Sequence, residues 1–115
     1  MVHIALPAPN NLSNHDSIIR PYYYANTAVP LLIDRMCSKY GCSKNALKIR
    51  IFGGADPLRK DIFQVGKKNL EITKKILTDM GLRYDSSQTG GKCSRTLELD
   101  VSNGNIKLTI LPIGI

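Results

Sequence analysis

The chain has 115 residues, a length that supports one domain with one modest hydrophobic core. Hydrophobic residues make up 43% of the sequence, which excludes a disordered protein, and no apolar run approaches the roughly 20 residues that a membrane helix needs. The 16 Lys and Arg against 9 Asp and Glu give a net charge of +7, which favours anionic partners, but the basic residues form no long block typical of nucleic-acid binding. The N-terminus has no secretory signal pattern, so we expect a cytoplasmic protein without membrane insertion.

The first half of the chain predicts a strand, a loop and a helix. Apolar residues alternate along 2–6, which is the period of a strand with one buried face, and His3 falls on the opposite face. Residues 7–23 are rich in Pro, Asn and Ser and predict a loop. An apolar stripe then predicts a helix from residues 26–27 to Gly41, and a glycine there is typical of a helix end. The residues of the stripe are Ala25, Ala28, Val29, Leu32 and Met36.

The second half predicts four strands and one helix. In chain order these are a strand at 46–52, a break at 53–56, a helix at 65–80, a short strand at 82–87, and a β-hairpin formed by 97–101 and 106–110 around the turn at 102–104. The helix is indicated by residues at helical spacing: Leu70, Thr73, Ile76, Leu77 and Met80. The order β-α-β-α-β-β-β predicts an α+β fold in which a mixed sheet carries two helices on one face. We find no internal repeat and no linker, so one domain over residues 1–115 is expected.

The cysteine and histidine positions do not predict a metal site. Cys37, Cys42 and Cys93 have no zinc-ligand spacing, and three reduced thiols are the expectation for a cytoplasmic chain. Cys37, beside the apolar stripe of a helix, is expected to be a small buried hydrophobe, and Cys42 an exposed thiol in a loop. His3, His15 and Asp16 also fit no known metal spacing.

Five stretches of the chain occur in an order that is typical of one family: "MVHIALP", "YANTAVPLLIDRM", "LKIRIFGGAD", "VGKKNLEITKKIL" and "TGGKCSRTLELDVSNGNIKL". Together they resemble the CheD-type chemoreceptor glutamine deamidases. That family pattern has a histidine shortly before Leu-Pro, a Tyr-rich helix start, a strand ending in Phe-Gly-Gly-Ala, a helix with Gly-x-(Arg/Lys)-Asn and a Gly-Gly-x-x-Gly-Arg hairpin. The resemblance extends from the first residue nearly to the last and implies a CheD-like cysteine hydrolase fold.

The resemblance implies an enzyme that converts specific glutamines on methyl-accepting chemoreceptors to glutamates. Such an enzyme needs no metal or other cofactor. A thiolate attacks the amide carbonyl, a histidine activates the thiol and later protonates the departing ammonia, and a hydrogen-bond donor stabilises the oxyanion. The implied partners are chemoreceptors and a CheC-type phosphatase.

On this resemblance, His3 is the general base and acid. The family's nucleophilic cysteine and threonine precede that histidine, in a β segment that has no counterpart in these 115 residues. We therefore expect a CheD-like domain over residues 1–115 that lacks the first strands of the family, is inactive by itself, and pairs through its unpaired sheet edge as a homodimer. The first alternative is a non-catalytic module that binds chemoreceptor helices or a CheC-type phosphatase. A small basic nucleic-acid-binding domain is a further alternative that the scattered charge disfavours.

The glycine-rich stretches are the remaining candidates. Phe52, Gly53, Gly54 and Ala55 follow a strand and are interpreted either as a wall of the substrate groove or as a tight turn. Cys93 lies in "GGKCSR", near the substrate surface that the resemblance implies, and is the one resident thiol that remains a nucleophile candidate. Asn69 is expected to bond to the backbone near the 53–56 turn.

Overall fold

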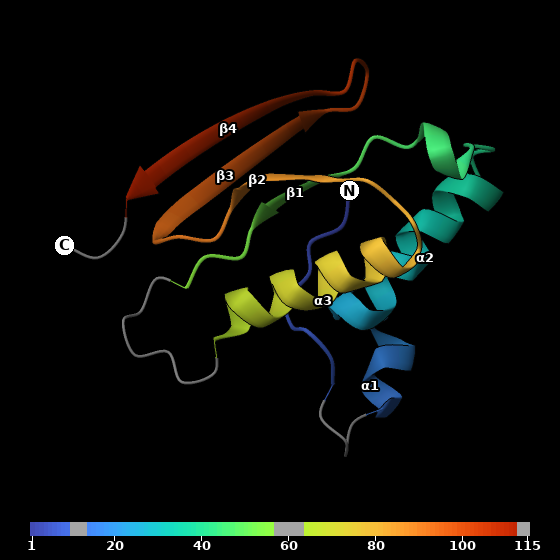
Figure 1. The fold of residues 1–115 in the computed structure, drawn as a ribbon, viewed down its shortest axis with the longest axis horizontal. Helices are drawn as coiled ribbons and strands as arrows, with labels where there is room; N and C mark the ends of the chain where they lie inside the picture. The colour runs from blue at the N-terminus through green and yellow to red at the C-terminus, as the bar shows by residue number, and fades with distance from the viewer. Residues whose placement is uncertain (10–13, 57–63, 113–115) are drawn as a thin grey trace.

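The computed structural model describes residues 1–9, 14–56 and 64–112 (Figure 1). Its elements are α1 (Asn14–Ile19), α2 (Ala25–Ser38), a short 3-10 helix (Lys44–Ala46), β1 (Arg50–Gly53), α3 (Val65–Asp79), β2 (Asp85–Thr89), β3 (Cys93–Asp100) and β4 (Asn105–Pro112). The predicted α+β class is confirmed, and both long helices lie on the same side of the strands (Figure 1). None of the helices in this described part has the length and apolar character to span a bilayer.

The strands run in mixed directions but form two separate two-stranded sheets. β1 and β2 are parallel, and α3 supplies the crossover that a parallel pair requires. β3 and β4 form the predicted hairpin, which is longer than the alternating pattern indicated and pairs from Cys93↔Pro112 to Asp100↔Asn105. The single mixed sheet of the sequence analysis is thus divided into a parallel pair and a hairpin.

The hydrophobic core lies between α2, α3 and the inner face of β1. Its buried residues are Val29, Ile33, Leu77 and Leu82, and partly buried side chains pack around them, among them Ile49 and Ile51. Side chains four apart on α2 lie on one face of the helix, and side chains two apart near β1 lie on one face of the strand. The two predicted periodicities therefore meet in one core.

The strand expected at 46–52 is shorter than its sequence pattern indicated, and the short strand expected at 82–87 lies at 85–89. The strand expected at 46–52 begins only at Arg50, since β2 starts at its ladder partner, Asp85. The Asp85 N–H donates a hydrogen bond to the Ile49 carbonyl, at 2.9 Å between nitrogen and oxygen, and Arg50↔Asp85 is the first pair of the ladder. Strand length is set here by the partner and not by the apolar alternation.

The first predicted strand is not formed, which corrects the interpretation of residues 2–6. These residues make no strand ladder with the described part of the chain, and Leu6 forms only an isolated bridge with Tyr24. The N–H groups of Ala5 and Leu6 both donate to the Tyr23 carbonyl, at 3.0 and 3.2 Å. The alternation instead reflects burial against the helices, since Ile4 packs against the core cluster.

The predicted loop at 7–23 contains the short helix α1, which was missed. The Asp16 carboxylate of this helix accepts hydrogen bonds from the Arg20 guanidinium, at 2.6 Å from Nη2, and from the Tyr24 hydroxyl. Tyr24 is buried at the start of α2, so the cluster attaches α1 to the core. The side chain of His15 lies outside the described residues.

Replacing Tyr24 with Phe should make the stability of the protein less sensitive to alkaline pH. The hydrogen bond to Asp16, with burial as a second cause, raises the pKa of the Tyr24 hydroxyl above its ordinary value of about 10. Because the pKa is higher in the folded state, this contribution is complete below pH 10 and is lost as the pH rises through the folded-state pKa. Urea unfolding from pH 8 to 11 should show the difference in the free energy of unfolding between wild type and Tyr24→Phe shrinking as the pH rises. A constant difference for Tyr24→Phe would contradict the assignment.

Candidate functional site

Two glycine-rich turns lie side by side where β1 and β2 end. The Gly90 N–H donates to the Gly53 carbonyl at 2.8 Å, and the Asp56 N–H donates to the Gly91 carbonyl at 3.3 Å. Gly53, Gly90 and Gly91 all have positive φ angles, between 74° and 96°, which a side chain would strain. The parallel pairing of the strands therefore continues beyond Gly53 into a paired double turn.

Arg95 of β3 fixes this double turn from the hairpin. Its Nη1 donates to the Gly90 carbonyl at 3.0 Å and lies 3.5 Å from the Gly53 carbonyl. Its Nε is buried and has no hydrogen-bond partner among the described residues. The sequence alone indicates this arginine only as part of the hairpin pattern. The signal that could have identified its role is an arginine on the inward face of a strand, five residues after a glycine pair.

The carboxylate of Asp56 caps α3 from ten residues upstream. It accepts hydrogen bonds from the backbone N–H groups of Gly66, at 2.9 Å, and Lys67, at 3.1 Å. A carboxylate at this position satisfies two first-turn donors and interacts favourably with the helix dipole. Asp56 was read from the sequence only as the end of a strand break, because nothing local links it to a helix that begins at Val65.

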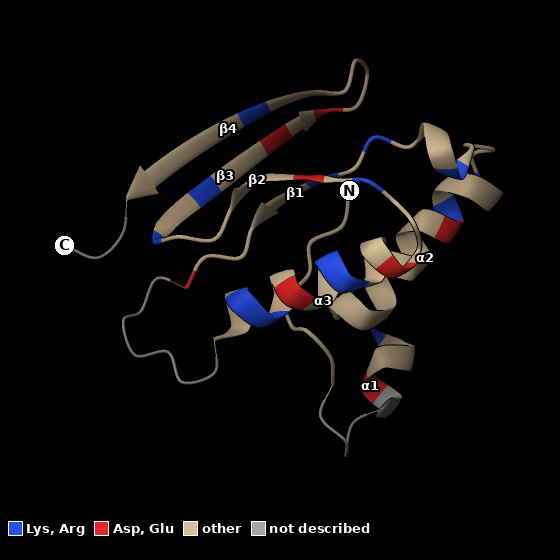
Figure 2. Cartoon of the chain, in the orientation of Figure 1, with Lys and Arg blue, Asp and Glu red and all other residues tan. Residues whose placement is uncertain are grey.

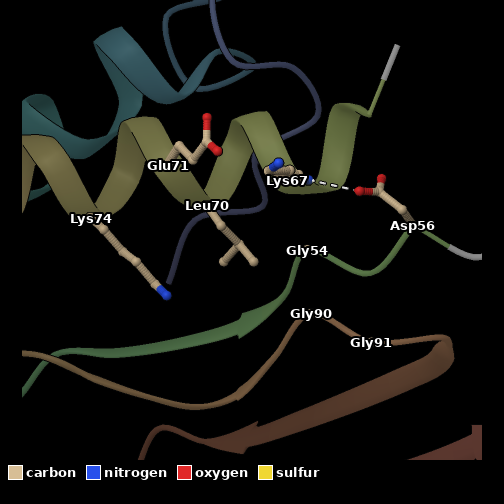
Figure 3. Close-up of a pocket in the computed structure, with 8 residues that line it drawn as sticks. All are labelled: Gly54, Asp56, Lys67, Leu70, Glu71, Lys74, Gly90 and Gly91. Carbon is tan, nitrogen blue, oxygen red and sulfur yellow. Dashed lines mark hydrogen bonds between the residues drawn. The ribbon is translucent and has the colours of Figure 1, made fainter. Parts of the chain in front are cut away.

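A pocket of about 350 Å³ opens between this double turn and α3 (Figure 3). Gly54, Gly90 and Gly91 line one side, and Lys67, Leu70, Glu71 and Lys74 of α3 line the other, with Asp56 at one end. Leu70 fills the narrow part, since its side chain lies where a Cβ on Gly54 would be, 2.4 Å from Cγ. Two lysines and two carboxylates give the lining no net charge. The pocket therefore presents paired donors and acceptors rather than an anion site.

The four residues predicted as a substrate wall have different surroundings. Gly54 lines the pocket. The Phe52 side chain instead contacts Arg50, whose guanidinium carbon lies 5.0 Å from the centroid of the Phe52 ring. The Gly53 carbonyl accepts the hydrogen bond from the Gly90 N–H. The Ala55 carbonyl oxygen lies close to Gly66 of α3. Of these four residues, Gly54 is the one that lines this pocket, and Gly53 takes part in the paired turn.

His3 is exposed and is not among the residues that line the pocket. It makes no hydrogen bond or ion pair with any described residue. Two residues later, the Ala5 carbonyl accepts a hydrogen bond from Asn69 Nδ2 of α3, at 3.2 Å. Asn69 thus bonds to a backbone carbonyl as expected, but in the histidine-bearing segment and not near the 53–56 turn.

The three cysteines lie in three different environments and are free thiols. Cys37 of α2 packs against the core cluster, as expected of a small hydrophobe. Cys42 is half-buried, with its sulfur 4.0 Å from the Tyr40 carbonyl oxygen, and Cys93 is the half-buried first residue of β3. The structure records no hydrogen bond between any of them and a described histidine.

Basic residues are spread over several elements and do not form one patch in the view of Figure 2. Lys and Arg occur on α2, α3, β3 and β4, and Asp and Glu are interspersed on the first three (Figure 2). On α3, Glu71 lies between Lys67 and Lys74 along the pocket (Figure 3). This mixture is typical of a solvated surface and is unlike the continuous basic stripe that follows a nucleic-acid backbone.

Comparison with known proteins identifies the family. A family profile described as "CheD chemotactic sensory transduction" matches residues 5–109. A protein of Methanococcus maripaludis named as a probable chemoreceptor glutamine deamidase CheD is 37% identical over 108 residues, which cover 92% of this chain and 67% of the relative. Proteins of the same name from Pyrococcus horikoshii and Clostridium botulinum are 32% and 34% identical, over 94% and 98% of this chain and 66% and 70% of their own lengths. The chain spans about two thirds of the length of these relatives, and it belongs to the CheD family.

Proposed function

We propose that this chain is the histidine-bearing part of a chemoreceptor glutamine deamidase. The observation that carries the proposal is the match of proteins with that name over more than nine tenths of the chain. His3 begins the "HIALP" stretch and is exposed, as a general base that meets a protein substrate must be. The chemoreceptor is the proposed partner, and the side-chain amide of a glutamine is the proposed reacting group.

The proposed reaction proceeds in two steps. A cysteine thiolate attacks the glutamine carbonyl carbon, and the resulting tetrahedral oxyanion collapses with loss of ammonia, which takes a proton from the histidine. The thioester is then hydrolysed by water that the histidine deprotonates, which releases glutamate and the free thiol. His3 is assigned the proton transfers in both steps.

The nucleophile of this reaction is not assigned to Cys37, Cys42 or Cys93. Cys37 packs against the core cluster, the Cys42 sulfur lies 4.0 Å from the Tyr40 carbonyl oxygen, and neither thiol is hydrogen-bonded to a described histidine. Cys93 starts β3 next to the double turn, while His3 lies outside that pocket. We therefore propose that the 115 residues alone bind substrate without hydrolysing it.

Ammonia release from a purified chemoreceptor cytoplasmic fragment tests this proposal. The 115-residue chain should give no release above background and no glutamine-to-glutamate mass increase in the fragment, and a variant with all three cysteines changed to serine should behave in the same way. Binding of the fragment should be retained in both proteins. If the chain did release ammonia and Cys93→Ser abolished the release, Cys93 would be identified as the nucleophile. Release that persisted in the variant without cysteines would contradict the thiol mechanism.

The second candidate function is a non-catalytic module that binds chemoreceptor helices or a CheC-type phosphatase. It is favoured by the inner face of the β3–β4 hairpin, where Leu97, Leu99, Ile106 and Leu108 are only half-buried and take no part in the core cluster. Calorimetric titration with the receptor fragment and with a CheC-type phosphatase distinguishes the two partners. Sedimentation of the chain alone tests the edge-strand homodimer. A nucleic-acid complex would show a steep salt dependence, which the mixed charges do not favour.

A further inference from the structure

Asn69 connects the middle of the molecule to the segment that carries His3. Its Nδ2 donates a hydrogen bond to the Ala5 carbonyl at 3.2 Å, across 64 residues of sequence. Among the described residues, this is the hydrogen bond through which a side chain of α3 reaches residues 1–9. The first segment is thus bonded to a helix side chain and not to a neighbouring strand.

The backbone of this segment is held from two sides. On one side, the N–H groups of Ala5 and Leu6 donate to the Tyr23 carbonyl, and the Leu6 carbonyl accepts from Ala25. On the other side, the Ala5 carbonyl has no ladder partner in the described chain, and Asn69 supplies its donor. The peptide group that joins Ala5 to Leu6 is thus bonded at both ends, at its N–H to the Tyr23 carbonyl and at its carbonyl to Asn69, and Asn69 supplies its bond to α3.

The donor and the acceptor of the Asn69 amide have different surroundings. Its Oδ1 is buried and has no hydrogen-bond partner among the described residues. A buried acceptor without a partner destabilises a fold, and an apolar side chain of similar shape would avoid that loss. The donor is thus the group through which the Asn69 amide is bonded to the rest of the described chain.

We propose that Asn69 is a positioning residue for His3. This inference rests on the proposed deamidase function, in which the His3 imidazole transfers protons at the substrate amide. Asn69 acts through the backbone, because the hydrogen bond from its Nδ2 to the Ala5 carbonyl holds the chain two residues after His3. The residue between them, Ile4, is held by its packing against the core cluster. Asn69 itself makes no contact with substrate.

The test compares Asn69→Leu with Thr73→Val, one helical turn further along α3. Leucine keeps the approximate size of the Asn69 side chain and removes the hydrogen-bond donor. Thr73→Val removes the hydroxyl of a largely buried residue on the same helix and is the matched control. In Asn69→Leu, backbone order parameters of residues 3–5 should fall from about 0.85 to below about 0.6. The His3 ring resonances should move to their positions in an unfolded chain. The amide resonances of α3 and the hairpin should stay dispersed, and Thr73→Val should leave residues 3–5 unchanged.

A second variant covers the case in which Asn69→Leu does not fold. Asn69→Asp keeps the shape of the side chain, and its carboxylate cannot donate to Ala5, so the same loss of order at residues 3–5 is expected. Retained order in a folded variant without the donor would overturn the positioning role and leave the deamidase proposal intact. Thiol-independent ammonia release would overturn the proposed thiol mechanism and leave the relaxation result unchanged, because that measurement needs no turnover.

Discussion

Replacing Leu77 with alanine is expected to lower the free energy of unfolding by about 2–5 kcal/mol, the range for a fully buried leucine. Leu77 is 2% exposed and contacts the core cluster that joins α2 to α3. The substitution removes apolar surface from the core and leaves a cavity that Val29 and Ile33 cannot fill from the facing helix. The loss is large compared with the 5–15 kcal/mol that typically stabilises a small domain.

Urea unfolding followed by far-UV circular dichroism measures this effect. Ile18→Ala is the matched control, because Ile18 is also helical and aliphatic but is 77% exposed, and a change within about 0.5 kcal/mol is expected there. A loss of about 2–5 kcal/mol in the free energy of unfolding is expected for a buried leucine. If the free energy of unfolding of Leu77→Ala were within about 1 kcal/mol of the wild-type value, the contact between the two helices would not be the centre of the core.

The helices and the hairpin could be predicted because their signals are local. The stripe on α3 predicted Thr73 and Leu77 as inward-facing residues, and both are largely buried. The alternation along β3 and β4 predicted their pairing, and the burial pattern of β3 alternates without a break. On α2 the same reasoning found Val29 but missed buried Ile33, since a run of apolar residues blurs the helical period.

The first segment shows where periodicity is insufficient. An alternation with a period of two indicates that one side of residues 2–6 is buried, but it does not identify the hydrogen-bond partner of the backbone. In the structure those partners are Tyr23, Ala25 and the side chain of Asn69. A partner 64 residues away leaves no local trace, so a strand and a backbone held by a helix side chain produce the same pattern.

The glycines of the candidate site could be predicted from the sequence. The residues that hydrogen-bond to the turns and to α3 could not. Gly54, Gly90 and Gly91 stand out from the sequence as breaks after strands, and all three line the pocket. The contacts of Arg95 and Asp56 with the turns and with α3 depend on tertiary folding. His3 was assigned by family resemblance, and the structure supplies its exposure and the bond that holds its segment.

Replacing Gly66 with alanine is expected to destabilise the protein by about 1–3 kcal/mol, although alanine is the better helix former. The intrinsic gain for Gly to Ala inside a helix is about 1 kcal/mol. Against it, a Cβ on Gly66 would lie 2.5 Å from the Ala55 carbonyl oxygen and 2.6 Å from the Gly54 carbonyl oxygen. Both are backbone atoms of a turn that is bonded to its neighbour, so relief requires α3 to move away from that turn.

The movement should also break the cap on α3, which identifies the cause. Asp56 bonds to the N–H groups of Gly66 and Lys67, so in Gly66→Ala the amide resonances at residues 66–67 should shift and exchange faster with solvent. Gly104→Ala in the hairpin turn is the matched control: its φ is +75° and a Cβ there would meet nothing within 4 Å. That variant should lose about 1 kcal/mol through backbone strain alone and leave α3 unperturbed. Unchanged stability and unchanged cap resonances in Gly66→Ala would mean that α3 does not need this close approach to form the wall of the pocket.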